Sequence, residues 1–232
     1  NLSIDFENLS KDQCSQISFL RLEIDNIPET YNGNLKNYFA DLGLNKNNFF
    51  TDVSNYISYE TGQPTHCYNA SKMNGKLVLS EIERTQEFET LLDKKITLTG
   101  KNLVFTLNNE VINLAGVIGN KNTSCSFNTH EVIVECGFFH PESIIGKSVK
   151  YDVQSDAAHK FERGVDPDCQ ERVLRRFIKV VSEQASIKNL SFISHQYQAN
   201  PKFKIPIDVE KVNKILGVEI DREKCNRNRV IR

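Results

Sequence analysis

The chain has 232 residues, 29 lysines and arginines against 30 aspartates and glutamates, and 39% hydrophobic side chains. This length supports one or two hydrophobic cores. No apolar run approaches the ~20 residues that cross a bilayer, and no basic start leads into an apolar stretch, so we expect neither a membrane-spanning nor a secreted protein. A formal net charge of −1 provides no overall positive field, so any contact with RNA is expected to be local.

The cysteines are scattered along the chain, at positions 14, 67, 125, 136, 169 and 225. They form no CxxC pair, and no histidine lies at the spacing of a zinc ligand. A chain of this length needs no disulfide framework. We therefore expect reduced, buried thiols, no metal site and a cytoplasmic location.

The first third of the chain predicts one strand and two helices. Residues 17–24 alternate between two faces, which predicts a half-buried strand. A helix is expected with Asn34 as its cap and Gly43 at its end, because apolar residues recur at helical spacing: Leu35, Tyr38, Phe39 and Leu42. A second helix is expected from Asp52 to Gly62, before Pro64.

The middle of the chain consists of short β-rich runs separated by turn residues, at 76–82, 96–98, 103–107, 110–114 and 132–134. Two adjacent asparagines, Asn108 and Asn109, separate two of the runs. They predict a hairpin turn, because asparagine tolerates a positive φ. Strands at this spacing predict a sandwich-like or barrel-like sheet.

The sequence after this β-rich region returns to helical patterns. Pro141 predicts the start of a short helix, and Asp168 is expected to cap a long one whose apolar stripe is Val173, Leu174, Phe177, Ile178 and Val181. Helices, then mostly strands, then helices predict an α+β fold with a β-rich, sandwich-like core flanked by helices.

The pattern restarts after the Ala-Asn-Pro sequence at 199–201. A strand is expected at 204–207 and a helix at 209–216, followed by a basic end. We therefore expect residues 1–200 to form one domain and residues 201–232 to be the truncated start of another.

Common catalytic motifs are missing from the sequence: it has no Walker-type loop, GxSxG, HExxH or GxGxxG after a strand. The histidines do not pair at metal-ligand spacing, and each alone is typical of a surface or core position. Glu135 interrupts an apolar run and precedes a cysteine, a glycine and two phenylalanines. We expect its carboxylate at the edge of an apolar pocket, where it needs a partner, although a solvent-facing strand residue is the plainer interpretation. Gly116 and Gly119 would allow a ligand close to the backbone, or are ordinary turn glycines.

Four segments then occur in one order: DVSNYISYETGQPTHCY at 52–68, LAGVIG at 114–119, VECGFFHP at 134–141 and SDAAHKFERGVDP at 155–167. Together they resemble the editing module of the bacterial-type phenylalanyl-tRNA synthetase beta subunit, across residues 14 to about 185. The resemblance implies an esterase that hydrolyses mischarged Tyr-tRNA(Phe). It implies as partners the acceptor end of tRNA(Phe) and an alpha subunit in a heterotetramer, with no DNA or membrane partner. ATP and magnesium would belong to the synthetic site of the whole enzyme, so no cofactor is implied for this chain.

Carried over position by position, the resemblance implies that Glu135 accepts the phenolic O–H of tyrosine. It implies that His66 orients the attacking water or holds the terminal adenosine. Five further positions would bind or shape the substrate, namely Asn55, Gly116, Gly119, Ser155 and Ala157. An apolar pocket rejects an added hydroxyl by only about 10²-fold, whereas a site that hydrogen-bonds the hydroxyl discriminates by about 10⁴ to 10⁵.

The sequence departs from the family pattern at four positions: Ser155 where threonine is common, Cys67 where alanine is usual, Asn69 in place of an aspartate and Asn120 in place of a second glycine. Asparagine is the non-glycine residue best able to adopt a left-handed backbone, and a shift of the loop at Asn120 would alter the contact expected at Gly119. The charged residues Lys160, Glu162 and Arg163 are expected to form structural salt bridges, with Arg163 and Glu162 locking the turn before Gly164. The alternative is a contact from Lys160 or Arg163 to the phosphates of the tRNA acceptor end. The alternative function is a non-catalytic scaffold or RNA-binding module that packs against the alpha subunit, but the retained His66 and Glu135 favour the hydrolase.

Overall fold

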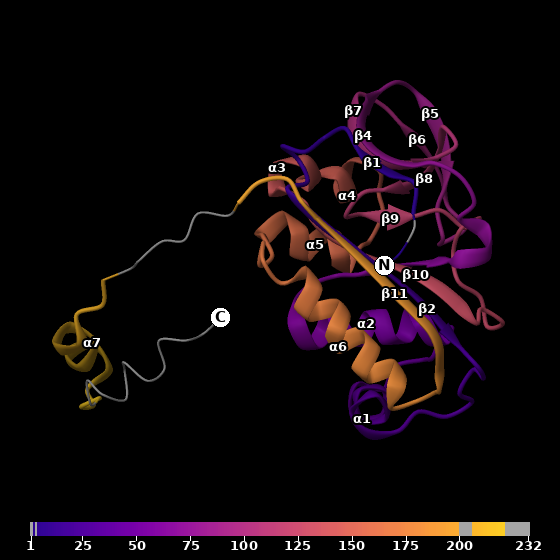
Figure 1. The fold of residues 1–232 in the computed structure, drawn as a ribbon. Helices are drawn as coiled ribbons and strands as arrows, with labels where there is room; N and C mark the ends of the chain where they lie inside the picture. The colour runs from indigo at the N-terminus through magenta and orange to yellow at the C-terminus, as the bar shows by residue number, and fades with distance from the viewer. Residues whose placement is uncertain (1, 3, 200–205, 221–232) are drawn as a thin grey trace. The chain divides into compact units, whose positions relative to one another are not determined.

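The structure is a computed structural model that describes residues 2, 4–199 and 206–220 (Figure 1). The chain divides into two compact units, residues 1–199 and residues 200–232. The described part of the second unit contains helix α7 (Val209–Leu216), as predicted, and residues 206–208 before it form no strand. Residues 204 and 205 of the predicted strand and the basic end lie outside the described residues. The assignment of the second unit to a following domain stays a prediction.

Two sheets form the centre of the first unit. The five-stranded sheet has the order β1 (Phe6–Asn8), β4 (Leu77–Glu83), β7 (Lys101–Leu107), β8 (Glu110–Leu114), β9 (Ile118–Gly119). The four-stranded sheet has the order β11 (Ile187–Gln196), β2 (Gln16–Ile24), β10 (Glu131–Phe138), β3 (His66–Asn69). A separate pair consists of β5 (Gln86–Glu89) and β6 (Lys95–Leu98). Strand β1 pairs with β4 in parallel, and the other named pairs are antiparallel.

Helices cover the outer face of the four-stranded sheet and one end of the space between the sheets (Figure 1). The first group is α1 (Gly33–Leu42), α2 (Phe49–Thr61) and α6 (Gln170–Ser182). The second group is α3 (Pro141–Ile144), α4 (Lys147–Lys150) and α5 (Asp156–Arg163), and a short 3-10 helix, η1 (Ala70–Lys72), follows β3. The α+β fold class is confirmed.

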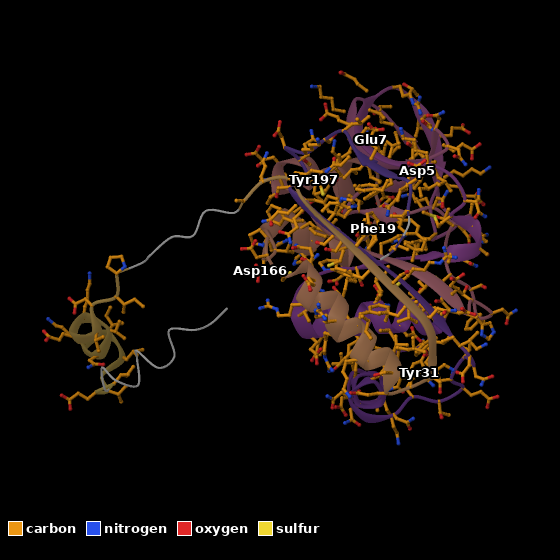
Figure 2. All side chains as sticks on the ribbon, viewed as in Figure 1. Asp5, Glu7, Phe19, Tyr31, Asp166 and Tyr197 are labelled. Atoms are coloured by element: carbon orange, nitrogen blue, oxygen red, sulfur yellow. The ribbon has the colours of Figure 1, made fainter. Side chains whose placement is uncertain are left out.

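The four-stranded sheet separates two hydrophobic cores. The first core lies between the two sheets and includes Phe19 and Phe105. The second lies between the four-stranded sheet and α1, α2 and α6, and includes Leu20 and Phe177. Figure 2 shows Phe19 surrounded by other side chains within the first unit. The strand predicted at 17–24 is confirmed as β2, but it is not half-buried: β2 has strands on both sides and a core on each face, so Phe19 and Leu20 are both fully buried.

The predicted starts of α1 and α2 are also wrong. The cap of α1 is Asn32, two residues before Asn34, and its side chain accepts no capping hydrogen bond. Helix α2 begins three residues before Asp52, and the Asn48 side chain caps it by accepting a hydrogen bond from the Thr51 N–H at 3.1 Å. Asp52 cannot serve as the cap, because its carboxylate is buried and accepts hydrogen bonds from other groups.

Helix α6 is capped by Cys169 rather than by the preceding Asp168. The predicted ends of α1 and α2, in contrast, are confirmed, because each helix ends at the expected glycine. Gly43 and Gly62 have φ values of 61° and 76°, the left-handed backbone that closes a helix.

The predicted strands correspond to β4, β6, β7, β8 and β10, and these predictions are confirmed. Asn108 and Asn109 form the hairpin turn with φ values of 51° and 72°, also as predicted. Strands β1, β3, β5 and β9, each four residues or shorter, were not predicted. Strand β11 was missed because it is a partly exposed edge strand of mixed polarity. Helix α5 was likewise not predicted.

Candidate active site between the two sheets

Strand pairing brings Glu135 and His66 together. Strands β10 and β3 are antiparallel, and in their register Glu135 lies opposite His66 and Ile133 lies opposite Tyr68. Directly opposed residues project on the same face of a sheet. That face is the one toward the five-stranded sheet, because Ile133 and Tyr68 belong to the core between the sheets. Two polar side chains therefore face the inside of a mainly apolar layer.

Glu135 is a buried carboxyl group with an unusual acidity. Its side chain is 4% exposed, so the solvent-facing interpretation is wrong. Burial raises the pKa of Glu135 to about 8, and a hydrogen bond from the Tyr68 hydroxyl acts in the opposite direction. The Tyr68 oxygen in turn accepts a hydrogen bond from Asn113 Nδ2 at 2.8 Å. The resident partner of this carboxyl is thus a phenolic O–H.

His66 presents an unpaired nitrogen. Burial lowers the pKa of His66 to about 4, so the imidazole is neutral at pH 7. Its Nε2 is buried and has no hydrogen-bond partner among the described residues. The ring stands edge-on to the Tyr68 ring, with centroids 4.4 Å apart. A neutral imidazole with a free nitrogen is suited to hold a water molecule or a ligand hydroxyl.

Two adjoining cavities open from this pair. The outer cleft has a volume of about 450 Å³ and lies beside α2, β9 and the start of α5. The inner cavity, of about 50 Å³, extends toward Glu135 and Asn113. The residues that line both are Pro64, Thr65, His66, Val117, Ile118 and Ala157. An inner cavity of this size holds about one or two water molecules.

All the predicted site residues line these cavities. Those that line the outer cleft are Asn55, His66, Gly119, Ser155 and Ala157. Those that line the inner cavity are His66, Gly116, Glu135 and Ala157. Residues that are up to 102 positions apart in the sequence, from Asn55 to Ala157, are therefore brought to one place.

The two glycines leave room for specific neighbours. A Cβ atom on Gly119 would lie 2.3 Å from His66 Cε1 and 2.6 Å from Nε2, so only glycine allows the imidazole its position. Gly116 has a φ of +68°, and a Cβ atom there would lie 2.9 Å from Ile144 Cδ1. Both glycines are consequently required by the packing around the cavities.

The Ser155 hydroxyl is committed to the fold. It donates to the Val117 carbonyl at 2.6 Å and accepts from the Ala158 N–H at 3.1 Å, which caps α5. This joins the start of α5 to the loop before β9 and fixes the wall on which Ala157 lies. Asn55 is exposed on α2 and faces the outer cleft.

Asn120 does not adopt the left-handed backbone that a glycine at this position would allow. The non-glycine residues with a positive φ among the described residues are Asp93, Asn108, Asn109 and Asp152. The Asn120 side chain instead accepts hydrogen bonds from the Thr123 N–H at 3.0 Å and the Thr123 hydroxyl at 2.6 Å. Cys67 lines the outer cleft, and Asn69 caps η1 through the Ser71 N–H.

The charged segment in α5 makes structural contacts. Lys160 forms an ion pair with Asp156 at 2.5 Å, one turn earlier in the helix. Glu162 accepts a hydrogen bond from the Gly146 N–H at 3.1 Å. Arg163 donates to the His159 carbonyl within α5. The ion pair of Lys160 confirms structural salt bridging in this segment, whereas Glu162 and Arg163, which were expected to lock the turn before Gly164, bond instead to backbone groups of Gly146 and His159.

The described part of the chain contains no cluster of three or more histidine, cysteine or acidic side chains that could hold a metal ion. Its cysteines, at positions 14, 67, 125, 136 and 169, are buried free thiols, as expected. Within the same residues, no helix has the length and apolar character needed to cross a membrane.

Tyr68 and Asn113 belong to the site but were not predicted as site residues. Tyr68 is two residues after His66 on β3, and Asn113, on β8, is three residues before Gly116. Both lie on the strand faces that point toward the cavities. Alternation from His66 along β3, and along β8, would have placed both on the inner face. The signal was lost because β3 is only four residues long.

This chain belongs to the B3/4 domain family, whose sequence model matches residues 19–186. Among characterised proteins it is similar to the phenylalanine–tRNA ligase beta subunit of Bdellovibrio bacteriovorus, with 34% identity over 193 residues that cover 82% of this chain and 24% of the relative. The beta subunit of Francisella tularensis is 30% identical over 183 residues, covering 78% of this chain and 23% of the relative. The family inferred from the four sequence segments is therefore confirmed.

A solved structure shares the fold. The crystal structure of an N-terminal fragment of the phenylalanyl-tRNA synthetase beta subunit from Pyrococcus horikoshii matches 94% of this chain and 60% of that fragment, with a TM-score of 0.52 and 11% identity. The present chain spans about a quarter of the length of the beta subunits it matches.

Proposed function

We propose that this chain is an editing module of a phenylalanine–tRNA ligase and hydrolyses the ester bond of mischarged Tyr-tRNA(Phe). One observation carries the proposal: a buried carboxyl group, Glu135, lines the inner end of the cavities and already accepts a phenolic O–H from Tyr68. A group with this environment is suited to recognise the side chain of tyrosine. Family membership supports a place in the beta subunit, with an alpha subunit and tRNA as partners.

Selection of tyrosine over phenylalanine would follow from the free energy lost when a bound side chain makes no hydrogen bond to the buried Glu135 carboxyl. A tyrosyl ring that enters through the outer cleft would stand where His66, Val117 and Ala157 line both cavities. Its hydroxyl would then reach the carboxyl and form a hydrogen bond with it. A phenylalanyl ring would displace water from the carboxyl without replacing that bond, which is costly for a buried polar group. The correct product is thereby protected from hydrolysis.

The chemistry requires only water and positioning. Water attacks the ester carbonyl carbon, the bond to the ribose oxygen breaks, and the proton that the water loses passes to the ribose oxygen as tyrosine leaves. His66 Nε2 would accept a hydrogen bond from this water and hold it beside the ester. With a pKa of about 4 the imidazole is a weak base, so we assign it to positioning the water rather than to taking its proton outright. The mechanism uses no cofactor.

The outer cleft is suited to the terminal adenosine. Leu91 and Leu92 provide apolar contacts, and the exposed Asn55 provides an amide group. The near-zero net charge supplies little general attraction for phosphates. We therefore assign the main grip on tRNA to other parts of the enzyme.

The test uses the complete beta subunit assembled with its alpha subunit and preformed Tyr-tRNA(Phe) or Phe-tRNA(Phe), without ATP. The parent enzyme should hydrolyse the tyrosyl ester, and Glu135→Ala should lose the preference for tyrosine over phenylalanine. Glu131→Ala is the matched control, because Glu131 is on the same strand but lines neither cavity. Hydrolysis by the parent no faster than in buffer would overturn the proposal and favour a scaffold or RNA-binding role.

A further inference from the structure

We propose that Tyr68 is a positioning residue for the selection of tyrosine, and that Asn113 holds it in this role. The inference rests on the proposed editing function. Tyr68 is on β3, two residues from His66, and its register partner Ile133 is two residues from Glu135. Its side chain is fully buried, so its hydroxyl must find its partners inside the protein.

The hydrogen bonds of the Tyr68 hydroxyl can be assigned a donor and an acceptor each. Asn113 Nδ2 donates to the Tyr68 oxygen at 2.8 Å. The hydroxyl has one proton, and an amide N–H cannot accept it. The proton is therefore directed to the Glu135 carboxyl, with which Tyr68 is hydrogen-bonded. Asn113, Tyr68 and Glu135 form a chain of hydrogen bonds that runs from the five-stranded sheet to the four-stranded sheet.

This chain leaves part of the carboxyl for a ligand. With a pKa of about 8 the Glu135 carboxyl is protonated at pH 7, so it has one acceptor oxygen and one O–H that can each pair with a hydroxyl group. Tyr68 pairs with one of these, while Glu135 also lines the inner cavity, as does Asn113. The terminal torsion of a glutamate is otherwise broad, so a fixed partner on one side restricts where the remaining oxygen points. Tyr68 thus holds the remaining oxygen where the substrate hydroxyl arrives.

The contribution of Tyr68 is specific to a tyrosyl substrate. A phenylalanyl ring makes no hydrogen bond to Glu135, so the orientation of the carboxyl does not help it bind. The Tyr68 ring also packs edge-on against His66, but Tyr68→Phe keeps the ring and removes only the hydroxyl. This substitution separates support for the imidazole from orientation of the carboxyl.

The experiment compares Tyr68→Phe, Asn113→Ala and the double variant in the assembled enzyme, on Tyr-tRNA(Phe) and Phe-tRNA(Phe). Tyr151→Phe is the matched control. Tyr151 is also a buried tyrosine, and its hydroxyl donates to Asn102 Oδ1 at 2.8 Å, but it lines neither cavity. Each single variant should lower kcat/KM for the tyrosyl ester about tenfold and leave the phenylalanyl ester unchanged. The double variant should lose no more than the larger single loss, because the residues act as one unit.

A second measurement does not depend on hydrolysis. Carbon-13 NMR titration of Glu135 should give a higher pKa in Tyr68→Phe than in the parent, because a bond that favours the charged form is lost. An equal loss on both esters, or an unchanged pKa, would overturn the inference and leave Tyr68 a packing residue. A parent enzyme that does not hydrolyse Tyr-tRNA(Phe) would overturn both the proposed function and this inference. A normal parent with an unchanged selectivity in Tyr68→Phe would overturn the inference alone.

Discussion

Glu135→Gln should raise the free energy of unfolding at neutral pH, because burial of a titrating carboxyl destabilises the folded state. Its pKa is raised from 4.5 to about 8. Between these values the unfolded chain releases the proton while the folded chain keeps it, so stability falls as pH rises through this window. The loss reaches about 3 kcal/mol at pH 7 and is below about 0.5 kcal/mol at pH 4.5. Glutamine has nearly the same shape, keeps an acceptor for the Tyr68 hydroxyl and carries no titrating group.

Urea denaturation of the 232-residue chain at pH 7 and pH 4.5 measures this difference. Glu135→Gln should be about 3 kcal/mol more stable than the parent at pH 7 and nearly equal at pH 4.5. His66, whose pKa is lowered to about 4, destabilises the fold as pH falls below 6.5, but it is present in both proteins and cancels in the comparison. Glu87→Gln, at an exposed position, is the control for the loss of one charge. A parent that equals or exceeds Glu135→Gln at pH 7 would refute the reasoning, because it would mean that Glu135 is ionised and well paired in the folded state.

Two further predictions concern the cavities, and a third concerns the buried carboxylate of Asp52, which lines neither cavity. Gly119→Ala should displace the His66 imidazole and slow hydrolysis of Tyr-tRNA(Phe) by about 100-fold, with the fold intact by circular dichroism. Ala157→Trp should fill the space that both cavities share and abolish hydrolysis of either ester while Phe-tRNA(Phe) synthesis continues; an unchanged deacylation rate would place the substrate elsewhere. Asp52→Ala should lower the free energy of unfolding in urea by about 2 to 3 kcal/mol, because it leaves the Tyr31 hydroxyl and the Asn47 N–H without their acceptor; a loss below about 0.5 kcal/mol would contradict this.

Local patterns predicted those parts of the fold that local interactions determine. The hairpin at Asn108 and Asn109 and the helix ends at Gly43 and Gly62 need particular backbone angles, which few residue types adopt. The helix starts were less predictable, since several asparagines and aspartates near each start were equally good candidates. At α2 the choice depended on burial of Asp52, which is a tertiary property.

The sequence predicted residues that line the site, but it did not predict how they are arranged in space. The four segments singled out Glu135 and His66, but nothing in the sequence indicated that β3 pairs with β10 and sets these two side chains opposite each other. Tyr68 and Asn113 escaped notice for the same reason, because a buried tyrosine and a strand asparagine become informative only when their hydrogen bond is seen. Long-range pairing decides both points, and it is not encoded in any short window of sequence.

The most direct test of the central claim is the ratio of kcat/KM for hydrolysis of Tyr-tRNA(Phe) to that of Phe-tRNA(Phe) by the assembled parent enzyme. The two substrates differ by one hydroxyl group, and Glu135 is assigned to recognise it. We predict that the tyrosyl ester is hydrolysed at least about 100-fold faster. Equal rates for the two esters would contradict the assignment of Glu135 to side-chain selection.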